Sequence, residues 1–180
     1  MNLNINRELP SPPHLNQPYL LSSLNSEENC LLVYSPLPPS QKVEEPNKKK
    51  FTFKPKEIVN TSEPVHIFDS LQVSWTTKET KGKFPSRREH AAHACLGDCL
   101  LIYGGINVSN SKSLNDLYAL NLNTWLWKKL FTMEAPPVNA NPITVILNDQ
   151  LVLIQEEVWV FQTKGVNWSA ESTDLPGGVW

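Results

Sequence analysis

The sequence has few of the residues that mark several common protein classes. It contains three cysteines in 180 residues (Cys30, Cys95 and Cys99), an odd number that does not suit a disulfide framework and favours the cytoplasm, or else the nucleus. It has no apolar run of about 18 residues, so we expect no membrane-spanning segment. Its N-terminus lacks the apolar stretch of a secretory signal. The net charge of −2 gives no basic field to attract nucleic acid or anionic lipid.

Glycine is scarce and proline is abundant, with 7 glycines against 15 prolines. Many of the prolines precede residue 65, which predicts a flexible N-terminal segment at residues 1–18 and a mobile insert at about 36–63. A basic stretch with two phenylalanines, Asn47 to Lys56, is compatible with nucleic-acid binding or a nuclear address. The acids of the neighbouring "VEEP" partly neutralise it, so we expect a solvated loop and no nucleic-acid partner.

An aromatic residue stands seven positions before a tryptophan three times in the chain. Each of these segments follows an apolar stretch ("CLLVY", "CLLIY", "QLVLI"), and each stretch follows another candidate strand ("PYLLSSL", "HAAHACL", "ITVIL"). The pattern predicts four short strands per unit, the last ending near the tryptophan, in units at about 19–82, 83–137 and 138–180. This spacing, roughly 40 to 50 residues, is typical of β-propeller blades. The aromatic pairs are Phe68 and Trp75, Tyr118 and Trp125, and Phe161 and Trp168.

We predict a two-residue hairpin turn at Gly97-Asp98. The strand register that this turn sets decides whether the nearby histidines and cysteines could bind a metal together. Neighbouring residues on a strand alternate between its faces, and directly opposed residues share a face. This turn therefore places Cys95 and Cys99 on opposite faces of the hairpin, and His90 and His93 also lie on opposite faces. We expect neither a tetrahedral metal site nor a Cys95–Cys99 disulfide.

The sequence contains no pattern that indicates catalysis. It has no G-x-S-x-G motif, and Gly104-Gly105 is not followed by the Gly-Lys-Ser/Thr of a phosphate-binding loop. Adjacent carboxylates, as at Glu156-Glu157, are typical of solvated surface. We therefore predict no catalytic, cofactor-binding or metal-binding residues, and no cofactor.

The second unit, Phe84 to Leu130, resembles a kelch repeat. The resemblance rests on Pro85, Arg87 and His90 before the first strand, on the pair Gly104-Gly105, on Tyr118 in "LNDLY", and on Trp125. The first unit keeps "VHIFDSLQVSW" but has Ser-Pro in place of the double glycine. The third unit keeps "VWVFQTKGVNW" but has Gln-Glu there and no preceding arginine or histidine.

This resemblance implies an all-β fold of antiparallel four-stranded blades, an incomplete kelch-type β-propeller of about three blades. Because kelch rings have about five to seven blades, four alternatives stay open: a fragment, a truncated isoform, a half-ring completed by a partner, or a sandwich that forms no ring. We expect the motif residues to be structural: Pro85, Arg87, His90, Gly104, Gly105, Tyr118, Trp125, Phe68, Trp75, Phe161 and Trp168.

The resemblance also implies a function. Kelch proteins often serve as scaffolds, so we expect a non-catalytic protein–protein interaction module whose partner is another protein. Self-association that completes the propeller is a further expectation. Two alternatives are a fragment or regulatory part of a kelch-propeller-containing enzyme, and a truncated isoform without independent function.

Overall fold

The computed structural model describes residues 10–11, 21–25, 30–34, 63–132, 134–137, 142–163, 166, 174–176 and 180. In these residues all regular secondary structure is β-strand: β1 Leu21–Asn25, β2 Cys30–Tyr34, β3 Glu63–Asp69, β4 Ser74–Gly82, β5 Arg88–Glu89, β6 Ala92–Leu96, β7 Cys99–Asn107, β8 Ser113–Asn121, β9 Leu126–Phe131, β10 Ile143–Leu147, β11 Gln150–Ile154, β12 Val158–Phe161 and β13 Asp174–Pro176. Over the same ranges, no helix has the length and apolarity needed to cross a membrane.

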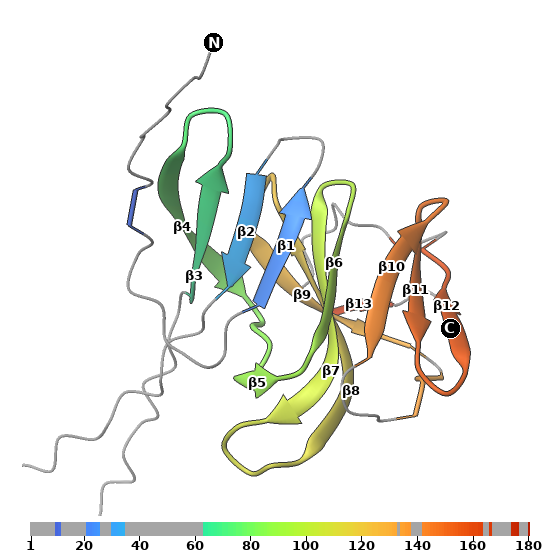
Figure 1. The fold of residues 1–180 in the computed structure, drawn as a ribbon. Coiled ribbons are helices and arrows are strands. Elements are labelled where there is room, and N and C mark those ends of the chain that lie inside the picture. The colour runs from blue at the N-terminus through green and yellow to red at the C-terminus, as the bar shows by residue number, and fades with distance from the viewer. Residues whose placement is uncertain are drawn as a thin grey trace, which may run out of the picture.

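The first four strands form one antiparallel blade in chain order, β1-β2-β3-β4 (Figure 1). The second blade consists of β6-β7-β8-β9, and the short β5 pairs with the end of β7. The end of β4 runs parallel to the start of β9, where Gly82 lies opposite Trp127. This contact joins the two blades into one continuous sheet.

The third blade is represented by β10-β11-β12, a separate antiparallel sheet. The strand β13 leaves this unit and pairs in parallel with β9 of the second blade. The predicted fourth strand of this unit, near Trp168, lies outside the described residues. So do the predicted N-terminal segment, apart from residues 10–11, and the insert, apart from Glu63.

The first strand of each blade, β1, β6 and β10, contacts its counterpart in the next blade, so these strands line the inner side of an arc (Figure 1). Side chains between the blades form two hydrophobic cores. One core lies between the first and second blades and includes Leu32, Val65, Leu120 and Trp127. The other lies between the second and third and includes Leu101, Leu117, Leu153 and Phe161. This arrangement confirms the predicted all-β fold of an incomplete propeller.

Burial on both faces explains why the central strand β7 is apolar throughout. Its residues from Cys99 to Gly105 are all buried, because one face of the strand packs on the first blade and the other on the third. A strand covered on both sides is expected to be a continuous apolar run rather than an alternating one, as "CLLIY" is.

The prediction that each unit's last strand ends near the tryptophan is wrong for the first two units. Strand β4 begins at Ser74, one residue before Trp75, and β9 begins directly after Trp125. The seven-residue spacing spans the hairpin turn between the third and fourth strands. In the first unit it pairs Phe68 directly with Trp75, whereas Tyr118 lies opposite Lys129.

Candidate interaction surface

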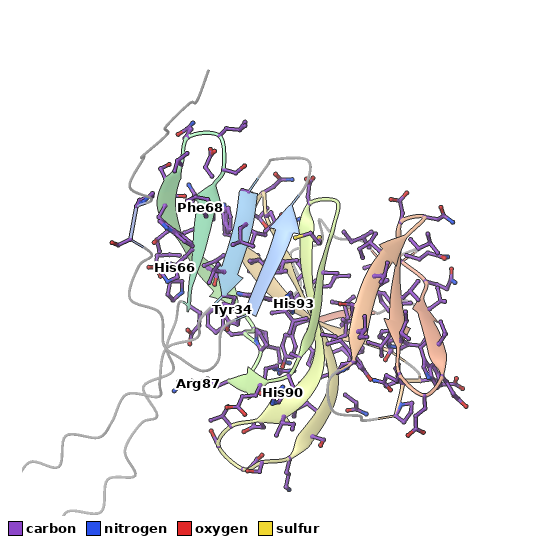
Figure 2. All side chains as sticks on the ribbon, viewed as in Figure 1. Tyr34, His66, Phe68, Arg87, His90 and His93 are labelled. Atoms are coloured by element: carbon purple, nitrogen blue, oxygen red, sulfur yellow. The ribbon has the colours of Figure 1, made fainter. Side chains whose placement is uncertain are left out.

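The segment before β5 carries three of the predicted motif residues. Pro85 is buried, Arg87 is half-buried, and His90 is exposed with a φ of 55°. The carbonyl of Arg87 accepts a hydrogen bond of 3.1 Å from the backbone N–H of Val108, which ties the segment to the β7–β8 loop. Figure 2 shows Arg87 and His90 on either side of β5. A framework role for these residues stays a prediction.

The buried arginine of this segment is not Arg87 but its neighbour Arg88, with 2% of its surface exposed. Its guanidinium donates to Asp116 Oδ1 at 2.5 Å and to the carbonyl of Gly104 at 2.9 Å. It also stacks over the ring of Tyr118, 5.3 Å from the centroid. Arg88 therefore fastens β5 to β7 and β8. The sequence pattern did not identify it, because two adjacent arginines offer no signal as to which one points inward.

The double glycine forms a bulge in the middle of β7. The register with β8 shifts between Tyr103 and Gly105, and both glycines have positive φ, 62° and 90°. A Cβ on Gly105 would lie 2.6 Å from the carbonyl oxygen of Glu89, and one on Gly104 would lie 3.1 Å from that of Leu114. The strand continues beyond the bulge to Asn107, so the pair bends the strand where it meets β5 instead of ending it.

The tryptophan at the centre of the first core is Trp127, which is fully buried. Its indole N–H donates to Thr80 Oγ1 at 3.0 Å, and its ring lies 5.0 Å from that of Tyr34. Trp125, which the motif singled out, is half-buried in the β8–β9 turn with a φ of 56°.

The remaining motif aromatics occupy three different places. Phe68 and Trp75 pack against each other across β3 and β4, 5.1 Å between ring centroids, on the face away from the second blade. Phe161 is fully buried between the second and third blades, 5.1 Å from the ring of Trp180. Trp168 lies outside the described residues.

The hairpin that bears the cysteines has the predicted register, with Cys95 opposite Leu100 and Leu96 opposite Cys99. Cys99 belongs to the core shared with the third blade and Cys95 packs against the core shared with the first, so the two face opposite ways. None of the three cysteines forms a disulfide, and burial raises the pKa of Cys99 to about 11, which disfavours the reactive thiolate. Within the described ranges no group of three or more His, Cys, Asp or Glu side chains could hold a metal ion.

Among the residues whose side chains the structure describes, the largest group of exposed apolar side chains lies on one face of the third blade. Along β10, Thr144 and Ile146 point toward the second blade, while Ile143, Val145 and Leu147 are 62%, 45% and 59% exposed. Their partners on β11 and β12 extend the same face. We call this surface the outer face of the third blade; it comprises Ile143, Val145, Leu147, Val152, Ile154, Val158 and Val160.

The opposite side of the same strands is fully packed. Leu151, Leu153 and Phe161 are at most 1% exposed and belong to the core shared with the second blade. Figure 1 shows β10, β11 and β12 at one end of the arc. Strand β4, in contrast, presents mainly threonine, lysine and glutamate to solvent. The outer face is thus apolar without being covered by any described residue, a composition typical of interaction sites.

The fold agrees with comparisons to known proteins. The family model of the KLHDC2/KLHL20/DRC7 Kelch-repeats domain matches residues 52–175. Kelch domain-containing protein 2 of Bos taurus is 35% identical over 113 residues, which cover 57% of this chain and 27% of that protein. Kelch domain-containing protein 1 of Homo sapiens is 39% identical over 94 residues, covering 49% of this chain and 22% of that protein.

A more distant match is host cell factor 1 of Homo sapiens, 28% identical over 97 residues, which cover 54% of this chain and 5% of that protein. The chain therefore spans about a quarter or less of the length of these relatives. Because the family model matches more than half of the chain, and the blades follow one another as its repeats require, the protein belongs to the kelch-repeat family.

Proposed function

We propose that the protein is a non-catalytic protein–protein interaction module, and that the outer face of the third blade is its binding surface. The observation that carries the proposal is the group of five large aliphatic side chains, 39% to 66% exposed, on one side of a single sheet. Exposed apolar surface of this extent disfavours an isolated domain in water, and burial against a partner removes the penalty.

Membership of the kelch family supports this role, because kelch repeats are generally an interaction fold. The chemistry of the described side chains supports it as well. The Cys99 thiol, whose pKa is raised, is buried. The guanidinium of the buried Arg88 is already bound to the carboxylate of Asp116 and the carbonyl of Gly104. We further propose a cytoplasmic or nuclear location, where cysteines that form no disulfide stay reduced.

The experiment is affinity capture with a matched pair of variants. Val158→Glu places a charge on the outer face at a side chain that is 66% exposed, and Leu71→Glu makes the same kind of change in the β3–β4 turn at a side chain that is 74% exposed. Proteins captured from a cell extract by the immobilised wild type are quantified by mass spectrometry. We expect Val158→Glu to lose the specific partners and Leu71→Glu to keep them.

Retention of every partner by a folded Val158→Glu variant would refute the outer face as the binding surface. Circular dichroism and thermal melting of the variants establish that they are folded. Since Val158 projects into solvent, its replacement removes no described core contact, and we expect the melting temperature to stay close to that of the wild type.

A further inference from the structure

We infer that Ser86 is a phosphorylation site, at which a protein kinase that prefers basic substrates transfers the γ-phosphoryl group of a nucleoside triphosphate to the side-chain hydroxyl. The side chains of Arg88 and Asn107 then hold the phosphate. The inference is independent of the proposed function, because Ser86 lies where the first and second blades join and not on the outer face of the third blade.

Ser86 is exposed, in a stretch of chain that belongs to no strand. Strand β4 ends at Gly82 and β5 begins at Arg88, so the residues between them form the link from the first blade to the second. Both blades that flank this link are described, and the pairing of β4 with β9 fixes them to each other. Surface segments of this kind are where modifying enzymes reach a side chain, so the hydroxyl of Ser86 is accessible to a kinase.

Basic residues stand on both sides of Ser86, in the sequence "KGKFPSRR". Lys81 and Lys83 are exposed and Arg87 is half-buried, whereas Arg88 is buried. In the folded chain a kinase therefore meets positive charge both before and after the serine. A substrate cleft lined with carboxylates is attracted by this charge pattern, and a cleft lined with basic residues is repelled by it. The pattern favours a basic-directed kinase over an acid-directed one.

Two N–H donors already point at the hydroxyl oxygen of Ser86. Arg88 Nη2 lies 3.1 Å from Oγ, and Asn107 Nδ2 lies 3.3 Å from it. Arg88 Nε also donates to the backbone carbonyl of Ser86 at 2.9 Å, which fixes the guanidinium beside the serine. A phosphate on Oγ brings its acceptor oxygens to these same donors. Hydrogen bonds from a guanidinium to a phosphate are charge-assisted and about twice as strong as neutral ones.

The charges around Arg88 can balance a further anion. Asp116 is paired with Arg88 and also lies 3.9 Å from Lys129, so two cations face one carboxylate. The side chain of Arg88 is only 1% exposed, so water screens its charge weakly. A phosphate adds a charge of about −1.5 to −2 at neutral pH, and its repulsion from Asp116 is offset by the guanidinium between them. Phosphoserine thereby ties the link between the blades to β7 through Asn107.

The transfer itself needs only the kinase and the nucleoside triphosphate. The hydroxyl oxygen of Ser86 forms a bond to the γ-phosphorus, and the bond from that phosphorus to the oxygen it shares with the β-phosphate breaks. The nucleoside diphosphate leaves with that oxygen. The hydroxyl proton passes to a carboxylate base of the kinase and from there to water.

Site-resolved phosphorylation of the full chain tests the inference. The folded chain is incubated with ATP and either protein kinase C, which is basic-directed, or casein kinase, which is acid-directed. Tandem mass spectrometry reads the phosphate at Ser86 itself, because other hydroxyl residues such as Thr52 also have lysines nearby. We expect the basic-directed enzyme to give an occupancy about tenfold above that of the acid-directed one. A Ser86 that protein kinase C leaves unmodified would overturn the inference.

Two variants serve as controls for this measurement. Ser109→Ala makes a change at an exposed serine that has no lysine or arginine within two positions, and it should leave the occupancy at Ser86 at the wild-type value. Ser86→Thr keeps a hydroxyl at the same place, so phosphothreonine must appear there. A Ser86→Thr variant that is folded by circular dichroism and carries no phosphate at this position would contradict the assignment.

A second measurement tests whether the fold holds the phosphate. A chain with phosphoserine incorporated at position 86 during translation should unfold at a temperature roughly 3 °C above that of the unmodified chain. Asn107→Asp keeps the oxygen that accepts from the backbone N–H of Ser109, but it replaces the donor toward Ser86 by an anion. In this variant the same phosphoserine should lower the unfolding temperature. An unchanged or lower temperature in the phosphorylated wild type would show that Arg88 and Asn107 do not hold the phosphate.

Discussion

The guanidinium of Arg88 and the carboxylate of Asp116 form an ion pair with 2.5 Å between Nη1 and Oδ1, and the side chains are 1% and 18% exposed. The two residues are 28 positions apart in the sequence, in β5 and in β8. The pair thereby locks the segment before the first strand of this blade onto the strands at its centre, and the remaining donors of Arg88 are taken up by Ser86 and Gly104.

Loss of Arg88 should destabilise the protein far more than loss of its neighbour. Replacing Arg88 by methionine keeps the length of the side chain but leaves Asp116, among the residues that the structure describes, with Lys129, 3.9 Å away, as its one charged partner. We expect the free energy of unfolding to fall by about 3 kcal/mol. Arg87→Met, at a half-buried side chain, should lower it by about 1 kcal/mol or less. Urea unfolding followed by tryptophan fluorescence measures both; equal losses would contradict the assignment.

The two tryptophans near the start of β9 should also differ. Trp127→Ala removes a fully buried ring and its hydrogen bond to Thr80, for an expected loss of about 4 kcal/mol in the free energy of unfolding. Trp125 is half-buried and has a positive φ, a backbone conformation that glycine adopts without strain. Trp125→Gly should therefore lower stability by much less, about 1 kcal/mol. Thermal melting compares the two, and a larger loss for Trp125→Gly would contradict the prediction.

Gly105 should not tolerate a side chain, whereas Gly97 should. The Cβ of Gly105→Ala would lie 2.6 Å from a backbone oxygen at a φ of 90°, and we expect a loss of about 3 kcal/mol or more. Gly97→Ala is the control, because its Cβ meets nothing within 4 Å and its φ is 49°, so only the left-handed backbone penalty of about 1 kcal/mol applies. Chemical denaturation of both variants checks the difference. Equal losses would mean that backbone strain, and not the contact with Glu89, decides the result.

Acidification should destabilise the first blade through His66. Burial lowers the pKa of His66 below its ordinary value of 6.5, with Glu79 opposing, and Nδ1 lies 2.9 Å from Thr77 Oγ1. Because the unfolded chain then binds the proton more readily than the folded one, stability is complete above pH 6.5 and falls as the pH drops below it. In His66→Gln this part of the pH dependence should disappear.

The matched control is His90→Gln, which makes the same substitution at an exposed side chain. The free energy of unfolding is measured between about pH 7.5 and about pH 5, a range that includes the ordinary histidine pKa of about 6.5. An identical slope in His66→Gln and wild type would place the acid sensitivity elsewhere. One such place is His93, whose pKa burial also lowers while its hydrogen bond to the Ala91 carbonyl opposes the shift.

Local residue pattern determined the blades of this protein. The strands "CLLVY", "CLLIY", "ITVIL" and "QLVLI", and the register set by Gly97-Asp98, follow from β-propensity, alternation and turn chemistry, all of which act within a few residues of each other. Their repetition indicated a propeller, because a blade cannot bury its faces alone.

Only the tertiary structure decided which side chains are buried and hydrogen-bonded within each blade. Choosing Arg88 over Arg87, and Trp127 over Trp125, depends on contacts with Asp116 and Thr80. The same holds for the apolar strands: "CLLIY" and "ITVIL" look alike, yet one is packed on both sides and the other only on one. Burial is a property of what lies across from a strand, and the strand's own residues cannot specify it. The open side of β10, β11 and β12 therefore became visible only when the blades were placed together.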